Sequence, residues 1–327
     1  MTGTTSDRAP APMLFCIDVE PDYTATQVAG AAPCEGFVVL ADLLGSMRSR
    51  LADLTGYPVH FTWLVRMDPH IRATYGTATH LLDLDEARFG ALLAAGDEIG
   101  VHVHPYVRDE QTGTWVDRFT DPSVIEDCLE STFDTYQQKF GSPCRSMSFG
   151  ALFMNEQILD VAERRGVRYD LSGVPGEPPT STGTPDFRAM PTFPYYPDRE
   201  MFQRAGMEGS RTIREIPQTS VDSSRLRHKV ARRVRGERPP YYRTHAMWRA
   251  RHLTAAQYWA AAAKNLGRLQ VPYFCHVLRS EALVVDRIAA TVGPILHRLP
   301  VGPILHRLPD DPIVELVRFQ TPAEWLG

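Results

Sequence analysis

Two pairs of acid–base and metal-binding residue types stand out, each at the end of an apolar run. Asp18 and Glu20 end the run LFCIDVE, and His102 and His104 lie in the stretch GDEIGVHVHPYV. Residues two apart on a strand point to the same side, so each pair would present both side chains together. One carboxylate with two neutral imidazoles can hold a divalent ion and leave positions open for water and substrate. The four residues therefore predict a catalytic metal site with a spare carboxylate base.

Each pair alone also has a structural explanation. A strand histidine is more often a hydrogen-bonded structural residue than a ligand, and a carboxylate at a strand end often caps the next helix. The joint presence of the two pairs favours the metal site. His276, in PYFCHVLRSE, adds a titratable group on a late apolar run, where a core role and a catalytic role are both open.

The elements that must position these residues alternate along the chain. Helix-like stretches separate short runs whose continuous apolar character predicts strands buried on both faces. These runs cover residues 14–20, 59–65, 98–104, 168–174, 212–218, 272–278 and 312–319. The alternation predicts a parallel α/β architecture, most simply a distorted (β/α) barrel of about seven strands in a single domain, with site residues at the carboxyl ends of the strands. We expect a flexible leader over residues 1–12 and the barrel over residues 13–327.

Two regions interrupt this alternation. Residues 174–211 are rich in Pro, Gly, Thr and Tyr and predict a long ordered loop over one rim of the barrel. Residues 225–251 hold nine Arg and one Lys against a single Glu, in a chain of formal net charge -4. A solvated helix and loop would explain this basic segment, and so would a clamp for an anionic group of a substrate.

Composition excludes several classes of protein. A hydrophobic fraction of 43% with 23% charged residues is ordinary for a globular enzyme, and no apolar run is long enough to span a membrane. The polar leader does not read as a secretory signal, which predicts a cytoplasmic protein. The net charge and the lack of a reading motif argue against nucleic-acid binding. The scattered cysteines, five in number, predict reduced thiols that lie mostly in the core.

Near the C-terminus, VGPILHRLP occurs twice in tandem, at residues 292–300 and 301–309. One short duplication is not a structural repeat array. We interpret it as a duplication that lengthens a surface helix or loop, and we expect no catalytic role for His297 or His306.

The order of the motifs resembles the polysaccharide deacetylase family, carbohydrate esterase family four. DVEPD, HFTWLV, GDEIGVHVHPY and FMNEQILDVAERRGVRYDLSGVPG carry the resemblance, which spans most of residues 13–283. The branch that it most resembles has D-x-D or D-x-E in place of an adjacent aspartate pair. The resemblance implies a distorted barrel and a metal-dependent hydrolase that removes acetyl groups from N-acetylated sugars.

The resemblance also implies roles for individual residues. Asp18 would be the catalytic base, while Glu20 and His102 would bind the metal. The family's second metal histidine usually lies four residues after the first, where this chain has Tyr106, so His104 would take its role. Ser148 stands where the family has an arginine that orients the catalytic aspartate. His276, two residues from the family's usual position, would be the general acid.

The resulting hypothesis is amide hydrolysis with a divalent ion, most simply zinc, that activates water. Asp18 would take the water proton and His276 would protonate the leaving amine. The expected substrate is a carbohydrate, with an anionic, nucleotide-linked or lipid-linked form suggested by the basic segment. Two alternatives remain open: a member of altered chemistry that binds carbohydrate without hydrolysis, and a hydrolase of a non-sugar acylated amine. The expected substrate-binding residues are Tyr106, Ser148, Tyr195, Trp248 and Arg249.

Overall fold

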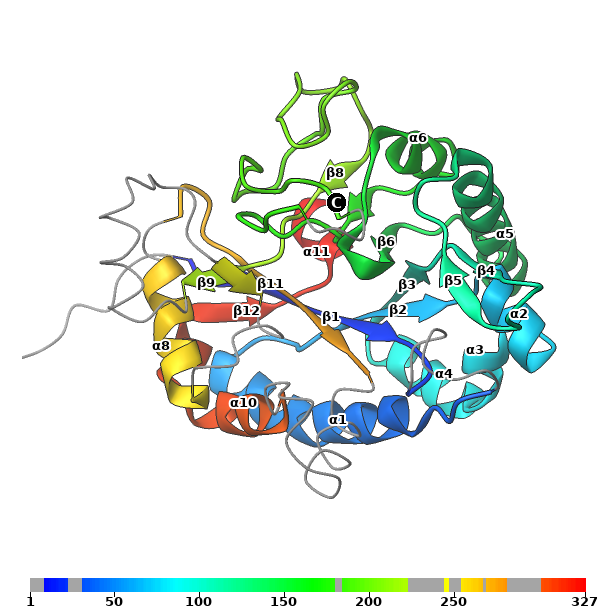
Figure 1. Cartoon of the computed structure of the whole chain (residues 1–327). Helices are drawn as coiled ribbons and strands as arrows, with labels where there is room; N and C mark the ends of the chain where they lie inside the picture. The colour runs from blue at the N-terminus through cyan, green and yellow to red at the C-terminus, as the bar shows by residue number, and fades with distance from the viewer. Residues whose placement is uncertain are drawn as a thin grey trace, which may run out of the picture.

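A curled parallel sheet forms the centre of the molecule, and helices pack against its outer face (Figure 1). This computed structural model describes residues 9–22, 31–179, 184–222, 244–246, 254–266, 269–280 and 301–327. The strand order is β11-β1-β2-β3-β6-β7-β8, with β12 also paired to β1, and every pairing is parallel. The expected distorted barrel of about seven parallel strands is confirmed. The strands are β1 (Ala11–Val19), β2 (Thr62–Arg66), β3 (Glu98–Val103), β6 (Ser146–Phe149), β7 (Tyr169–Asp170), β8 (Arg214–Glu215), β11 (Phe274–Arg279) and β12 (Val317–Phe319).

The helices begin and end where local sequence directs. The Asp121 and Asn155 side chains accept hydrogen bonds from backbone N–H groups at the starts of α5 and α6, and α1 is followed by Gly56, whose φ is 72°. The helices are α1 (Glu35–Thr55), α2 (Pro69–Tyr75), α3 (His80–Asp83), α4 (Glu86–Ala94), α5 (Pro122–Phe140), α6 (Glu156–Arg164), α8 (Ala255–Leu266), α10 (Val301–Arg307) and α11 (Pro322–Leu326). Short 3-10 turns are η1 (Gly150–Leu152), η3 (Leu308–Asp310) and η4 (Pro312–Leu316).

The two faces of the sheet bury separate apolar clusters. Along β1, Phe15 and Ile17 pack on the helix side, whereas Leu14 and Cys16 pack inside the barrel. Because side chains alternate along a strand, Asp18 follows the inner set. The same alternation applies to β3 and β11, so the parity of a residue on each strand decides whether it faces the helices or the interior.

One end of the barrel interior is closed by apolar packing. Trp325 and Leu326 of α11 pack against the inner cluster, and the Trp325 ring lies 5.1 Å from that of Tyr273. Glu324 of the same helix contacts His60, which precedes β2. The carboxyl ends of the strands are therefore the open end, which is where a parallel barrel builds its sites.

The remaining strands form two antiparallel pairs outside the barrel: β4 (Tyr106–Arg108) with β5 (Trp115–Asp117), and β9 (Ser220–Asp222) with β10 (Thr244–Ala246). The first copy of the duplicated nonapeptide lies outside the described residues, and the second forms α10 and begins η3. All cysteines are free thiols, and all but the half-buried Cys34 are buried, which confirms that prediction. Within the described ranges, no helix has the length and apolar character needed to cross a membrane.

Candidate active site

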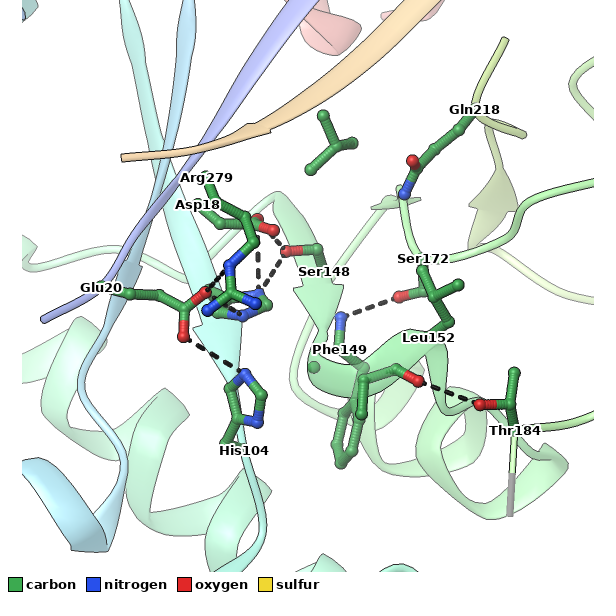
Figure 2. Close-up of a pocket in the computed structure, with 14 residues that line it drawn as sticks. Asp18, Glu20, His104, Ser148, Phe149, Leu152, Ser172, Thr184, Gln218 and Arg279 are labelled. Atoms are coloured by element: carbon green, nitrogen blue, oxygen red, sulfur yellow. Dashed lines mark hydrogen bonds and ion pairs between the residues drawn. The ribbon is translucent and has the colours of Figure 1, made fainter. Parts of the chain in front are cut away.

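A cleft of about 310 Å³ opens at the carboxyl ends of the strands. Figure 2 shows Asp18, Glu20 and His104 on one side of it, and Ser172, Thr184 and Gln218 on the other. The volume lies near the lower limit of ordinary small-molecule sites. The strand alternation described above places the side chains of Asp18, His102 and Arg279 in the interior, so one rule accounts for three residues that line the cleft.

Three of the predicted residues form a compact donor set. One ligand atom each from Glu20, His102 and His104 lies within 4.8 Å of the others, and all three residues are buried. Glu20 Oε1 is 3.6 Å from His102 Nε2, and Glu20 Oε2 is 3.4 Å from His104 Nε2. Although buried, His102 Nε2 has no hydrogen-bond partner among the described residues. A divalent ion would satisfy this atom, so the residues fit the expected metal.

Ser148 joins the metal-binding residues to Asp18. Its hydroxyl donates to Asp18 Oδ1 at 2.7 Å and lies 2.7 Å from His102 Nδ1. Because the hydroxyl proton points to Asp18, the serine oxygen accepts the Nδ1–H of His102. This bond fixes the imidazole tautomer and leaves Nε2 for an ion, which is how metal-binding histidines are usually oriented.

His104 is held by packing instead. Its ring stacks on Tyr106 at 4.8 Å with an interplanar angle of 4°, and its Nδ1 has no hydrogen-bond partner in the part of the chain that the structure describes. On its other side, a Cβ at Gly150 would come within 2.1 Å of the His104 ring. The glycine is therefore needed for the ring to occupy this position.

The turn after β6 carries unusual backbone geometry. Ala151 and Leu152 have φ values of 54° and 56°, in the left-handed region that residues with a Cβ rarely adopt. Both residues line the cleft, and Thr184 donates to the Ala151 carbonyl at 3.2 Å. Backbone strain of this kind concentrates at functional sites, which supports a ligand-binding role for the cleft.

Two arginines balance the carboxylates. Arg279 Nε lies 3.1 Å from Glu20 Oε1, and Arg66 Nη1 lies 3.9 Å from Glu20 Oε2. Burial works against the charged form of Glu20, but Arg279 and His102 outweigh it and hold its pKa well below the usual range. Arg66 is itself fixed by a bond from Nε to Asp68 at 2.8 Å. Glu20 therefore stays ionised, as a metal ligand must.

The acid–base groups have different charge states. Burial lowers the pKa of His104 to about 3, so its imidazole is neutral near pH 7 and its contact with Glu20 is not an ion pair. Burial tends to lower the pKa of His102 too, but Asp18 and Glu20 raise it overall. Burial raises the pKa of Asp18, against the opposing effect of His102. A raised pKa makes Asp18 a better proton acceptor than an exposed aspartate.

The predicted role of His276 is corrected by its position. His276 does not line the cleft; it shares the outer face of β11 with Phe274 and Leu278, while Val277 and Arg279 face inward. Its ring packs 5.4 Å from Phe15 and 5.7 Å from Trp259, and its Nδ1 bonds the Tyr258 hydroxyl at 3.1 Å. The described part of the chain therefore places His276 away from the cleft, which argues against the general-acid role predicted for it.

The expected substrate-binding residues divide into three groups. Ser148 lines the cleft, but its hydroxyl is engaged by Asp18 and His102. Tyr106 stacks on His104, and the buried Tyr195 donates its hydroxyl proton to Phe202 O at 2.8 Å. Neither residue lines the cleft, so both predictions are corrected. Trp248 and Arg249 lie outside the described residues.

Sequence reasoning missed Arg279, Ser172, Thr184 and Gln218, all of which line the cleft. Arg279 pairs with Asp18 in the β1–β11 register, and its side chain faces the barrel interior. The other three come from loops, and no periodic pattern places loop side chains at a site.

A solved structure shares this fold, and another matches it less closely. A structure titled "putative glycoside hydrolase/deacetylase" from Parabacteroides distasonis matches over 96% of this chain and 69% of its own, with 12% identity and a TM-score of 0.55. A "putative polysaccharide deacetylase" from Mycobacterium smegmatis matches 98% and 96%, with 13% identity and a TM-score of 0.42. No family model and no curated protein matches the sequence. The match to the Parabacteroides distasonis structure shows that this chain shares the fold of that putative glycoside hydrolase/deacetylase.

Proposed function

We propose that the protein is a metal-dependent hydrolase that removes an acetyl group from an N-acetylated amino sugar or glycan. The observation that carries the proposal is the buried set of Glu20, His102 and His104, with the Asp18 carboxylate connected to it through Ser148. The resemblance of the motif order and the shared fold point to the same chemistry. The substrate class rests on that resemblance.

The donor set suits a divalent ion, with zinc as the expected one. Such an ion would polarise the acyl carbonyl and make water a better nucleophile near neutral pH. The chain's own residues then have to bind the substrate, orient it and move protons. Glu20 is held ionised and His104 neutral, so both are in the protonation states that ligands require.

Asp18 is the proposed proton carrier. It is buried, faces the cleft and has one oxygen fixed by Ser148, so the remaining oxygen can receive a proton from the attacking water. Amide hydrolysis also requires a proton on the departing nitrogen. Because His276 faces the opposite side of β11, we propose that Asp18 passes on the proton that it has just received.

Arg279 is the proposed contact for developing negative charge. Among the described residues that line the cleft, it is the one arginine or lysine, and Figure 2 shows its guanidinium beside Glu20. We further propose that the substrate has an anionic, nucleotide-linked or lipid-linked group. We also propose that the protein is cytoplasmic. Comparing matched neutral and anionic acetylated sugars as substrates would test the anionic group.

The decisive test measures metal content and acetate release together. Wild-type protein loaded with zinc is incubated with N-acetylglucosamine oligosaccharides, and Asp18→Asn is compared with Asp53→Asn on the exposed surface of α1. We expect Asp18→Asn to keep its ion and lose about 100-fold or more of its turnover, because it can no longer accept a proton. Equal turnover in the two variants would contradict the role of Asp18, and wild-type protein that binds no ion would contradict the metal centre.

A second candidate is a protein that binds acylated carbohydrate without hydrolysing it. It is favoured by Ser148 at the position of the family's arginine and by the placement of His276 away from the cleft. Calorimetric binding of an N-acetyl oligosaccharide to the zinc-loaded protein without release of acetate would select this function. Acetate release from non-sugar acylated amines, with none from sugars, would select the alternative of a hydrolase that acts on a non-sugar acylated amine.

A further inference from the structure

Gln218, in the wall of the cleft, has a buried acceptor without a partner among the described residues. Gln218 is 4% exposed and lines the wall opposite Asp18 and Glu20. Its Oε1 has no hydrogen-bond partner in the described part of the chain. Figure 2 shows the carboxamide turned toward the space between the two walls. A buried acceptor without a donor costs free energy, so its presence calls for a partner that the structure lacks.

The orientation of this carboxamide is fixed by chemistry. Gln218 Nε2 donates to the backbone carbonyl of Leu171 at 2.9 Å. The opposite orientation would place Oε1 against that carbonyl, two acceptors in contact, and would leave Leu171 O without its donor. Oε1 is therefore the atom left without a partner among the described residues, and that partner must be an O–H or N–H group.

The backbone that carries Gln218 is tied down on both sides. Gln218 N donates to Gly173 O at 2.8 Å, and Tyr273 donates its hydroxyl proton to Pro217 O at 2.7 Å. Thr219 N donates to Cys275 O at 2.8 Å, and the Thr219 hydroxyl oxygen accepts Cys275 N at 2.9 Å. A side chain on such a segment cannot move far to find another partner, so it is pre-organised for a ligand.

The adjacent wall offers Gln218 no donor. The Ser172 hydroxyl donates to Asp170 Oδ1 at 2.6 Å and accepts Phe149 N at 2.8 Å, so its proton is already used. The Thr184 hydroxyl proton is likewise used on Ala151 O. These two hydroxyls line the same wall, and both donate inward to the protein. Neither hydroxyl of this wall can therefore donate to Gln218 among the described residues, which leaves a group bound in the cleft as the donor.

We infer that Gln218 Oε1 accepts a hydrogen bond from an N–H or O–H group of the bound acylated sugar, and that Gln218 thereby selects substrates with a donor at that point. The inference rests on the proposed function, since it takes the cleft to be the substrate site. Sites built to bond a substrate donor discriminate strongly against analogues that lack it, because the protein acceptor is then left unpaired. Acylated amines and hydroxylated sugars carry such donors, whereas simple acetyl esters do not.

The test combines ligand analogues with a variant. Binding of the tri-N-acetylglucosamine oligosaccharide to the zinc-loaded protein is measured by calorimetry, beside an analogue N-methylated at the amides and analogues that lack single hydroxyl groups. Gln218→Met removes the acceptor at similar side-chain length. Gln157→Met is the matched control: Gln157 Nε2 also donates to a backbone carbonyl, Pro122 O at 2.8 Å, but it does not line the cleft.

We expect Gln218→Met to bind the parent trisaccharide about tenfold more weakly than wild type, and Gln157→Met to match wild type. One analogue should bind wild type about tenfold more weakly than the parent does, and should bind Gln218→Met as tightly as the parent does. The group altered in that analogue, the amide or one hydroxyl, is then the donor. Equal affinity of wild type and Gln218→Met for the parent would overturn the inference. So would analogues that all bind wild type as tightly as the parent, a comparison that needs no variant to fold.

Acetate release is followed on the same samples, so that the two failures stay distinct. Binding that depends on Gln218 without acetate release would overturn the proposed hydrolysis and support the inference. Acetate release that is insensitive to Gln218 and to every analogue would support the hydrolase and overturn the inference. A wild-type protein that binds none of these sugars would overturn the inference as well.

Discussion

At the scale of single residues, the two histidines of the candidate metal centre are held by different means. Ser148 orients His102 through a hydrogen bond, whereas Tyr106 and Gly150 confine His104 by contact alone. His104 also replaces a histidine that the resembled family usually carries two residues later. The part that His104 plays is therefore the sharpest test of the metal site.

We predict that His104→Ala weakens zinc binding by more than about 100-fold, because it removes one of the three donors. Competition with a chromophoric chelator measures the affinity directly. His306→Ala, on the exposed side of α10, is the control and should bind zinc as wild type does. If His104→Ala kept wild-type affinity, the ion would not sit between Glu20 and the histidine pair.

Ser148 gives a second prediction at this scale. Ser148→Ala removes the acceptor of His102 Nδ1–H and the donor to Asp18, so we expect a loss of about 10- to 100-fold in zinc affinity or turnover with little change in substrate KM. Ser146→Ala is a matched control, because Ser146 lies on the same strand with the same parity and donates to a carboxylate, that of Glu98, away from the cleft. Equal losses in both variants would reduce Ser148 to a structural residue.

Residue types and spacing predicted the metal-binding half of the site because both pairs lie on strands, where the alternation of side chains is fixed. His276 failed for the same physical reason: its parity on β11 sends it outward, and the sequence alone did not show which parity was inward. Arg279 and Gln218 were missed although Gln218 ends the predicted run 212–218 and Arg279 follows the run 272–278. Their positions depend on how β11 and the segment after β8 meet, a contact between parts of the chain distant in sequence.

At the scale of elements, the turn from β6 into η1 shapes the floor of the cleft. Gly150→Ala would place a Cβ 2.1 Å from His104 Cε1, so we predict a displaced ring, weaker zinc binding and a lower midpoint of thermal unfolding. Gly90→Ala is the control, since a Cβ at Gly90 in α4 would meet no atom within 4 Å, and it should stabilise the protein by up to about 1 kcal/mol. A Gly150→Ala protein with the zinc affinity and the melting temperature of wild type would show that the turn at Gly150 can shift to accommodate the added Cβ without displacing His104.

The strands that were predicted best are those with long apolar runs. Runs at 14–20, 98–104 and 272–278 correspond to β1, β3 and β11 within a few residues. The runs at 168–174 and 212–218 shorten to β7 and β8, because the chain there turns into the loops that form the wall of Ser172 and Gln218. Strand β6 was not predicted: its sequence, SMSF, is short and half polar, and its two serines face carboxylates instead of apolar side chains.

At the scale of the whole molecule, the sheet separates a polar interior end from an apolar layer under the helices, and His276 lies on the apolar side. Tyr258 and Trp259 of α8 and the strand residue Phe15 enclose it. Burial lowers the pKa of His276 to about 3, so the folded protein keeps this imidazole neutral where the unfolded chain would protonate it. The layer therefore makes folding sensitive to acid.

The sign of this effect follows from proton binding. Below the ordinary histidine pKa of about 6.5, the unfolded chain binds a proton at His276 and the folded protein does not. The free energy of unfolding therefore decreases as the pH is lowered from about 6.5 to about 3, by up to about 1.4 kcal/mol per pH unit. His276→Gln cannot ionise and still offers Tyr258 a partner, so the difference between its unfolding free energy and that of wild type should move in its favour from pH 7 to pH 4.5. Urea unfolding at the two pH values measures this change. Tyr258→Phe, which leaves His276 titratable, should keep the wild-type slope.

The same variant tests the corrected position of His276. Because the side chain faces away from the cleft, His276→Gln should retain zinc affinity and any acetate release to within about twofold once its folding is verified. A folded, zinc-loaded His276→Gln protein that had lost turnover would place the histidine at the reaction and restore it as the general acid. Retained turnover with a flattened pH dependence of unfolding would leave Asp18 as the proton carrier in the cleft and assign His276 to the layer between the sheet and α8.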